Sequence, residues 1–190
     1  MARYDLEKLL NVAAEVFTTR GYDGTSIENL AQATGLSKSS IYHHVTGKEQ
    51  MLRLALERAV DPLHAVMTEP GATSGKAVDR LEYVIRSQVE VLVDRLQFVT
   101  LLLRVHGNTE TERWALDRRR EFDAFVVSLV REGIDQGDLR ADLDAGTVAR
   151  LMSGTINSLV EWYRPGRGQL GPAELADTVV ATIFSGLRAA

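Results

Sequence analysis

A chain of 190 residues that is 45% apolar and 25% charged has the composition of an ordinary globular protein, which excludes a disordered or fibrous polypeptide. Cysteine is absent, so the sequence also excludes a disulfide framework and a thiolate metal site. The formal net charge of −4 argues weakly against DNA binding, although residues 35–48 contain Lys38, Lys48 and two histidines and no acidic residue.

The sequence gives no sign of a membrane or export segment. No window approaches 18 uninterrupted apolar residues, and residues 1–5 lack the charged-then-apolar layout of a signal peptide. We therefore expect a cytoplasmic protein without membrane contact. No cofactor is expected. No metal site is expected either, because adjacent His43 and His44 would project about 100° apart on a helix, and His64 and His106 are isolated in the sequence.

Apolar residues recur at helical spacing almost throughout the chain, and no run alternates between turn signals as a strand would. The predicted fold class is therefore all-α, with roughly nine helices. The first helix is expected from about Leu6 to Arg20, because a stripe of apolar residues is followed there by a stop at Gly21.

Two short helices are expected next, separated by a tight turn around Gly35. Thr25 and Glu28 have the T-x-x-E spacing of a capping box, in which each side chain pairs with a backbone N–H left free in the first turn of a helix. The second helix should end at Gly35, and Ser37 can cap a third helix that runs to about His44.

The rest of the chain predicts longer helices. Thr46 and Glu49 have capping-box spacing and should open a long helix, in which Pro62 should cause a kink or a thinner turn. Residues 69–75 combine Pro, Gly and small polar residues, so they are expected to form a surface loop. Further helices are expected at about 76–94, 96–106, 110–136, 144–163 and 172–187.

A helix, a glycine-containing turn and a second short helix form the layout of a helix-turn-helix, whose second helix enters the major groove of DNA. The apolar side chains of this segment can pack its helices together: Ile27, Leu30, Ala31, Leu36, Ile41 and Val45. The polar side chains then face outward: Lys38, Ser39, Ser40, Tyr42, His43 and His44. Hydroxyls, an amine and helix N-terminal amides suit phosphate oxygens, so this surface is predicted to bind DNA.

This segment resembles the signature of the TetR family of transcriptional regulators. The likeness covers about the first quarter of the chain and rests on Leu30-Ala31, Thr34-Gly35-Leu36-Ser37, Ile41-Tyr42, His44 and Lys48-Glu49. Val45 stands where Phe is usual and Ser39 where Gly is frequent. Neither difference removes a polar contact.

The resemblance implies a homodimeric repressor that a small-molecule effector releases from a palindromic operator in double-stranded DNA. It also implies a helix-turn-helix DNA-binding domain at residues 1–47 and a ligand-binding and dimerisation domain at residues 48–190. The DNA-facing set that it implies is Thr25, Ser37, Lys38, Ser39, Ser40, Tyr42, His43, His44 and Lys48. Lys38, Tyr42 and His43 are expected nearest the DNA, while the alternative for Tyr42 and His44 is that they brace the third helix.

The last two predicted helices carry wide apolar faces interrupted by small residues, which favours close packing against more than one neighbour. Their apolar members are Val148, Leu151, Met152, Ile156, Leu159 and Val160, then Leu175, Val179, Val180, Ile183, Phe184 and Leu187. In TetR-like proteins the corresponding pair forms a four-helix dimer interface, which is expected here. A purely intramolecular core is the alternative.

Residues 157–166, which end a helix with two aromatics and a cation before Pro-Gly, are similar to a segment of TetR-type regulators that respond to acyl-coenzyme A thioesters. Such an effector needs cations for its phosphates and an apolar tunnel for its acyl chain. The predicted ligand-binding set is Arg113, Trp114, Arg118, Phe122 and Trp162. The alternative is that Arg118 to Arg120 form a solvated helix face paired with acidic neighbours and that both tryptophans belong to the core.

An enzyme is not expected, because the sequence lacks a G-x-S-x-G elbow, an H-E-x-x-H motif and a cysteine nucleophile. Residues 71–76 resemble a phosphate loop but are one residue short and lack the following Ser or Thr. Three other regulatory functions stay open. One is control of efflux or resistance genes by a hydrophobic drug-like ligand, another is activation of transcription in place of repression, and the third is regulation without any ligand.

Overall fold

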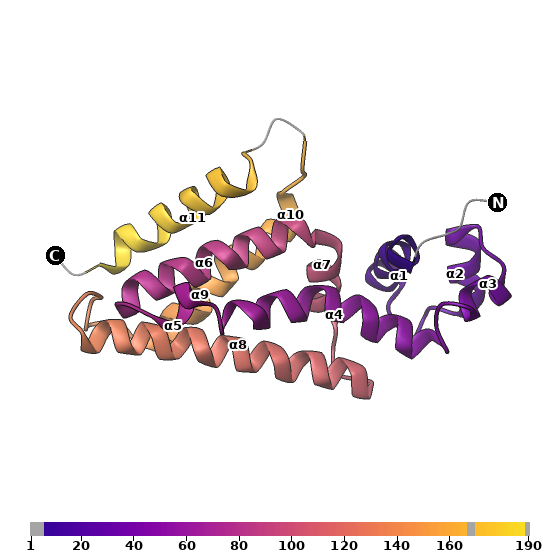
Figure 1. Ribbon diagram of the computed structural model, residues 1–190, viewed down its shortest axis with the longest axis horizontal. Helices are drawn as coiled ribbons and strands as arrows, with labels where there is room; N and C mark the ends of the chain where they lie inside the picture. Colours follow the sequence, from indigo (N-terminus) through magenta and orange to yellow (C-terminus); the bar gives the residue numbers. More distant parts are fainter. Residues whose placement is uncertain (1–5, 167–169, 189–190) are drawn as a thin grey trace. The chain divides into compact units, whose positions relative to one another are not determined.

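The computed structural model describes residues 6–166 and 170–188, and within them it is built from α-helices (Figure 1). This confirms the predicted all-α class. The helices are α1 Leu6–Arg20, α2 Ile27–Thr34, α3 Lys38–Tyr42, α4 Lys48–Val66, α5 Pro70–Thr73, α6 Ala77–Asp94, α7 Leu96–Arg104, α8 Glu110–Asp135, α9 Ala145–Asn157, α10 Leu159–Trp162 and α11 Pro172–Leu187.

Two short helices were not expected from the sequence. Residues 69–75 were predicted as a loop, but Pro70 starts the helical turn α5, and Gly71 lies so close to the ring of Tyr83 that a Cβ there would approach it to 2.6 Å. The helix predicted at 144–163 is divided at Ser158 into α9 and α10. The formation of α5 depends on packing against residues distant in the sequence, which local sequence patterns do not reveal.

The chain forms two compact units. The first contains residues 1–60 and 95–116, and the second contains residues 61–94 and 117–190, as far as each is described. Helices α4 and α8 each contribute one part to either unit. Pro62 lies inside α4, which continues to Val66. The functional division at residue 47 stays a prediction, since compactness alone says nothing about which residues bind DNA.

The core of the first unit is built around α1, which packs against α2 and α7. The apolar stripe predicted for the first helix is buried at Leu9, Leu10 and Phe17, and α7 adds the fully enclosed Phe98. Each buried side chain of this size contributes about 1.5–3 kcal/mol of hydrophobic stabilisation. This core holds the two short helices that follow α1.

The core of the second unit lies between α6 and the helices that pack on it, namely α5, α9 and α11. Most apolar side chains expected at the dimer interface are buried inside this unit: Val148, Met152, Ile156, Leu159, Leu175, Val179, Val180 and Phe184. The exposed faces of α9 and α11 carry small residues instead, together with Leu151, which is 67% exposed. The surface of α9 and α11 that remains available to a second protomer is therefore smaller than the sequence predicted.

Candidate nucleic-acid interface

Helix α2 starts at a capping box, but its members differ from those predicted. Ser26 is the N-cap: its Oγ accepts from the backbone N–H of Asn29 at 3.2 Å, and the Asn29 side chain accepts from the backbone N–H of Ser26 at 2.9 Å. The pairing expected between Thr25 and Glu28 is therefore wrong. Thr25 is buried instead, and its hydroxyl donates to the Gly21 carbonyl at 2.7 Å.

The turn between α2 and α3 has the predicted geometry. Gly35 has φ 69° and ψ 14°, a left-handed conformation that favours glycine because it has no Cβ. Ser37 then caps α3, since its Oγ accepts from the backbone N–H of Ser40 at 3.1 Å. Leu30 and Ile41 are fully buried and hold the two helices against each other, as expected.

The opposite side of α3 is exposed and polar. The side chain of Lys38 is 54% exposed and Tyr42 is 53% exposed, while Ser39 and His43 are also open to solvent. Ser40 and His44 are half-buried. An exposed aromatic ring beside an amine, hydroxyls and imidazoles provides hydrogen-bond donors and acceptors of the kinds that contact phosphates and base edges. Four members of the predicted outward set are therefore exposed on α3 and its C-cap: Lys38, Ser39, Tyr42 and His43.

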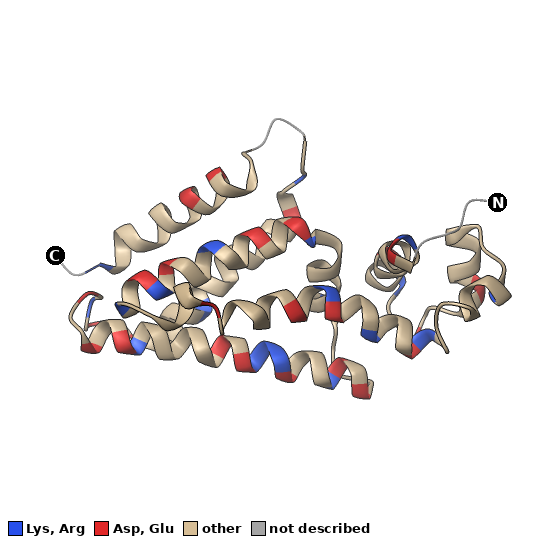
Figure 2. Ribbon diagram, viewed as in Figure 1, with Lys and Arg blue, Asp and Glu red and all other residues tan. Residues whose placement is uncertain are grey.

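Lys38 is ion-paired with Glu28 on α2, which the sequence did not predict. The hydrogen bond from Lys38, followed by one from the backbone of Glu28 itself, lowers the pKa of the Glu28 carboxyl to about 2. The Glu28 carboxylate is therefore charged throughout the neutral range. Figure 2 shows that charged positions are few along the ribbon of α2 and α3 and that they include both acidic and basic residues. A phosphate must compete with Glu28 for the Lys38 ammonium.

We expect Glu28→Gln to increase affinity for nonspecific duplex DNA severalfold, because it frees Lys38 for a phosphate. A freed cation that neutralises one more phosphate should also steepen the slope of log affinity against log salt by about 0.9. Fluorescence anisotropy at several salt concentrations measures both. Glu15→Gln, which removes the same charge from an exposed position on α1, is the control. Equal effects of the two substitutions would show that only net charge matters.

Lys48 is held inside the first unit. Its ammonium donates to the carbonyls of Tyr22 at 2.8 Å and Thr25 at 2.9 Å and lies 4.0 Å from the centre of the Tyr22 ring. Burial, followed by the nearby Glu49, raises the pKa of Tyr22. These contacts tie the start of α4 to the segment between α1 and α2. Thr25 and Lys48 thus have intramolecular roles, and their predicted contact with DNA stays a prediction.

The start of α8 is fixed by short-range capping contacts. Glu112 is buried and accepts from the backbone N–H groups of Asn108 at 2.6 Å and Thr109 at 3.1 Å. Thr111 donates to Glu49 on α4 at 3.1 Å. Just before α4, Thr46 pairs with Gln50: the Gln50 side chain accepts from the Thr46 backbone N–H at 2.5 Å and from its hydroxyl at 3.0 Å. The capping box predicted for Thr46 and Glu49 is therefore wrong.

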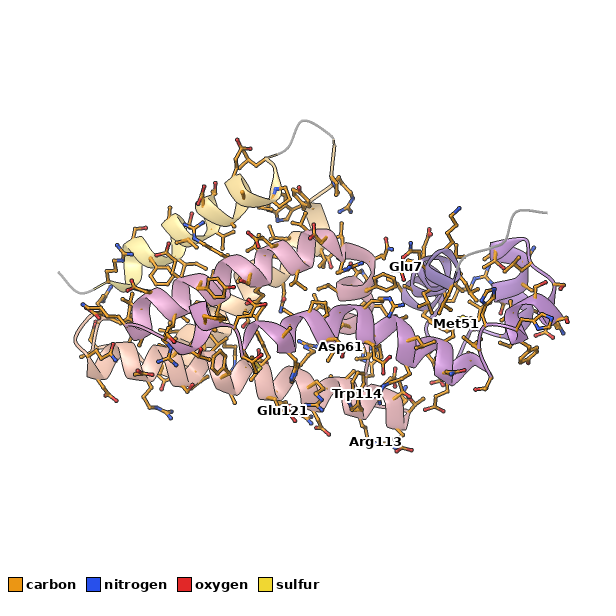
Figure 3. The ribbon with its side chains drawn as sticks, viewed as in Figure 1. Glu7, Met51, Asp61, Arg113, Trp114 and Glu121 are labelled. Carbon is orange, nitrogen blue, oxygen red and sulfur yellow. The ribbon has the colours of Figure 1, made fainter. Side chains whose placement is uncertain are left out.

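Two members of the predicted ligand-binding set lie in the first unit (Figure 3). Arg113 is exposed and donates to the carbonyls of Gly107 at 3.2 Å and Asn108 at 3.3 Å. Trp114 is half-buried, and the guanidinium of Arg53 lies 3.4 Å from the centre of its ring. Trp114 therefore stacks under a cation, an arrangement that the sequence did not reveal because the two residues are far apart in it.

The other three members lie in the second unit. Phe122 is buried, whereas Trp162 is 51% exposed and meets Tyr163 edge-on. Arg118 pairs with Glu121 at 2.8 Å, the kind of helix-face ion pair weighed as the alternative. Phe122 is thus a core residue, whereas Arg118 and Trp162 are more open to solvent. That the five residues bind a ligand together stays a prediction.

Across residues 6–166 and 170–188 no cluster of His, Asp and Glu could hold a metal ion. In the same described residues no helix is long and apolar enough to cross a membrane.

Comparison with known proteins adds independent findings. Residues 9–55 match the family model of bacterial regulatory proteins, tetR family, and residues 74–187 match that of the tetracyclin repressor-like C-terminal domain. The crystal structure of a member of the TetR transcriptional regulator family from Streptomyces coelicolor A3 is 56% identical in sequence. It covers 95% of this chain and 91% of its own, with a TM-score of 0.88.

Two further relatives carry functional descriptions. The HTH-type transcriptional repressor KstR2 of Mycobacterium tuberculosis is 27% identical over 95% of this chain and 91% of its own, and the structure of this ketosteroid transcriptional regulator superposes with a TM-score of 0.86. AibR, solved in complex with isovaleryl coenzyme A and operator DNA, is 26% identical over 94% of this chain and 97% of its own, with a TM-score of 0.75.

Proposed function

Since this chain belongs to the TetR family of bacterial transcriptional regulators, we propose that it represses transcription by binding a palindromic operator in the cytoplasm and releases it when a small-molecule effector binds. It is a DNA-binding regulator and not an enzyme. The single observation that carries the DNA-binding role is the exposed polar surface of α3, where Lys38, Ser39, Tyr42 and His43 are open while Ile41 is buried.

A homodimer supports this function because an operator with two half-sites needs two recognition helices about 34–36 Å apart, roughly one turn of B-DNA. The exposed faces of α9 and α11 are the proposed contact. Gly154, Ser158 and Ser185 are small and exposed there, so two pairs of helices could approach closely around Leu151. Leu151→Arg should then convert the dimer to a monomer in analytical ultracentrifugation while leaving the helical content unchanged.

An acyl-coenzyme A thioester is the proposed effector class. AibR has been solved with isovaleryl coenzyme A, and a relative in Bacillus subtilis that is 21% identical over 95% of this chain is described as a fatty acid metabolism regulator protein. Within this chain, Arg113 and Arg118 are cations that CoA phosphates could engage in place of their present oxygen partners, and Phe122 is apolar. Trp114 and Trp162 are the remaining members of the predicted ligand-binding set.

The test is release of a defined operator. Binding sites are first selected from a random DNA pool, and the selected duplex is then titrated with a thioester and with its free acid in a gel-shift assay. We expect the thioester to release the DNA and the free acid to be ineffective. Equal effects, or none, would refute the thioester class but leave DNA binding intact. Failure to select any salt-sensitive palindromic site would refute the operator itself.

A further inference from the structure

Few polar residues in the described part of the chain are buried, and all but one of these are hydrogen-bonded; the half-buried Thr18 also has an enclosed hydroxyl oxygen without a partner. Among the described residues there are five: Thr25, Thr34, Gln88, Thr111 and Glu112. Thr25 and Thr34 donate to carbonyls four residues back in the chain, Thr111 donates to Glu49, and Glu112 accepts from two backbone amides. Gln88 is the exception, and it is also the member of this group that lies in the second unit.

Gln88 is embedded in an apolar stripe of α6. It is 7% exposed, and the residues one turn before and after it on the same face, Val84, Ile85 and Leu92, are buried. Its Oε1 has less than 1 Å² of solvent-accessible surface and no hydrogen-bond partner in the part of the chain that the structure describes. The helices packed against α6 bury apolar side chains, among them Met152, Ile156 and Val180.

An amide in this position is unfavourable for the ligand-free protein. Folded proteins pair the large majority of their buried polar atoms, so each exception calls for a specific reason. An ordered water would need two to four polar partners, and the residues one turn away from Gln88 on the same face of α6 are apolar. Leucine or methionine would fill the same volume without loss of hydration. The amide therefore fits a partner that arrives from outside the chain.

We propose that Gln88 is the polar anchor of the effector site and binds an uncharged oxygen, a hydroxyl or a keto group, carried on an otherwise apolar effector body. This rests on the proposed function in one respect, that a small-molecule effector binds this chain; Gln88 would hold the oxygenated part of that effector in the second unit. A carboxamide suits either group, because its oxygen accepts from a hydroxyl and its nitrogen donates to a ketone.

The anchored group is neutral because nothing in the surrounding core would balance a charge. Among the described residues of the second unit, none of the buried side chains is Asp, Glu, Lys, Arg or His. A buried carboxylate or ammonium without a partner is strongly disfavoured, whereas a neutral oxygen needs only the hydrogen bond that Gln88 offers. The expected effector is therefore an oxygenated acyl compound and not a plain hydrocarbon chain.

The first measurement needs no ligand. Gln88→Met keeps the length of the side chain and removes the unpaired amide, so the melting temperature of the ligand-free protein should rise. Thr18→Val is the matched control, because the Thr18 hydroxyl oxygen on α1 is likewise buried and without a partner in the described residues, but lies in the first unit. A fall in the melting temperature of Gln88→Met, reproduced by Gln88→Leu, would show that the amide is already satisfied and would overturn the proposal.

The second measurement compares matched ligands. The probes are dodecanoyl-CoA, the same thioester carrying one hydroxyl or one keto oxygen at successive carbons, and the corresponding free acids, each titrated against the full-length protein by calorimetry. At least one oxygenated probe should bind about tenfold or more tightly than its plain parent, because the plain chain leaves the amide unpaired. Gln88→Met should abolish this preference, and Thr18→Val should retain it.

The outcomes separate this proposal from the thioester proposal. If oxygenated free acids show the Gln88-dependent preference as strongly as thioesters, the anchor is correct and the thioester class is wrong. If thioesters bind but oxygen makes no difference, or if the preference survives in Gln88→Met, the anchor is wrong and the thioester class stands. If no probe binds the parent protein, the oxygenated acyl effector and with it the anchor role of Gln88 are wrong, whereas the DNA-binding role stands.

Discussion

Replacing Lys38, Tyr42 and His43 together by alanine is expected to reduce operator affinity at least about a hundredfold. Each contact of such side chains to a base or a phosphate typically contributes about 1–3 kcal/mol, and the three lie on one exposed surface of α3. Because none of them is buried, the free energy of unfolding should change by only about 0.5 kcal/mol per substitution. Gel-shift titration and thermal denaturation measure the two effects.

The control for the triple variant is Arg131→Ala, which removes one positive charge from an exposed position on α8 in the second unit. It should leave operator affinity nearly unchanged. If the triple variant bound the selected operator as tightly as the parent protein, α3 would not be the element that reads DNA, and the proposed interface would have to be abandoned.

Replacing Lys48 by methionine is expected to destabilise the protein by about 2 kcal/mol, because the substitution leaves two carbonyls without their charged donor. The aliphatic part of the side chain is retained, so packing changes little. Operator affinity should fall as well, since the segment that Lys48 fastens precedes α2. Chemical denaturation and anisotropy titration report these changes separately.

The alternative for Lys48 is direct contact with a phosphate, which the family resemblance implies. In that case the methionine variant should keep its stability, and the salt slope of operator binding should become shallower by about 0.9 for the one lost phosphate contact. Lys8→Met, at an exposed position on α1, is the control for how the loss of any one lysine changes the stability and the salt slope. Loss of stability with an unchanged slope would support the bracing role.

Helix boundaries were predicted best where a strong local signal coincided with an amphipathic stripe. The predicted helices Leu6–Arg20 and Pro172–Leu187 are those observed, because Gly21 stops the first and Pro172 starts the last. Capping was predicted less well. Thr25-x-x-Glu28 and Ser26-x-x-Asn29 overlap in the sequence, and the structure uses the second because the hydroxyl of Thr25 bonds to Gly21 instead.

The candidate site was predictable as a set of residue types but not as a set of contacts. The outward set on α3 follows from periodicity around the buried Ile41. The pairing of Lys38 with Glu28 depends on the angle between α2 and α3, and the stacking of Arg53 on Trp114 joins residues 61 positions apart, which periodicity does not encode. Gln88 did leave a signal, because a polar residue interrupts an apolar stripe at helical spacing.

The small number of buried side chains in α3 affects how the operator preference of this protein can change. This helix has five residues and buries a single side chain, Ile41, so most of its sequence is free of constraints from folding. Substitutions on its outer face could alter which bases are read without disturbing the second unit. Chimaeras that exchange only this helix should therefore respond to the original inducer at a new promoter, which makes the protein a suitable scaffold for engineered biosensors.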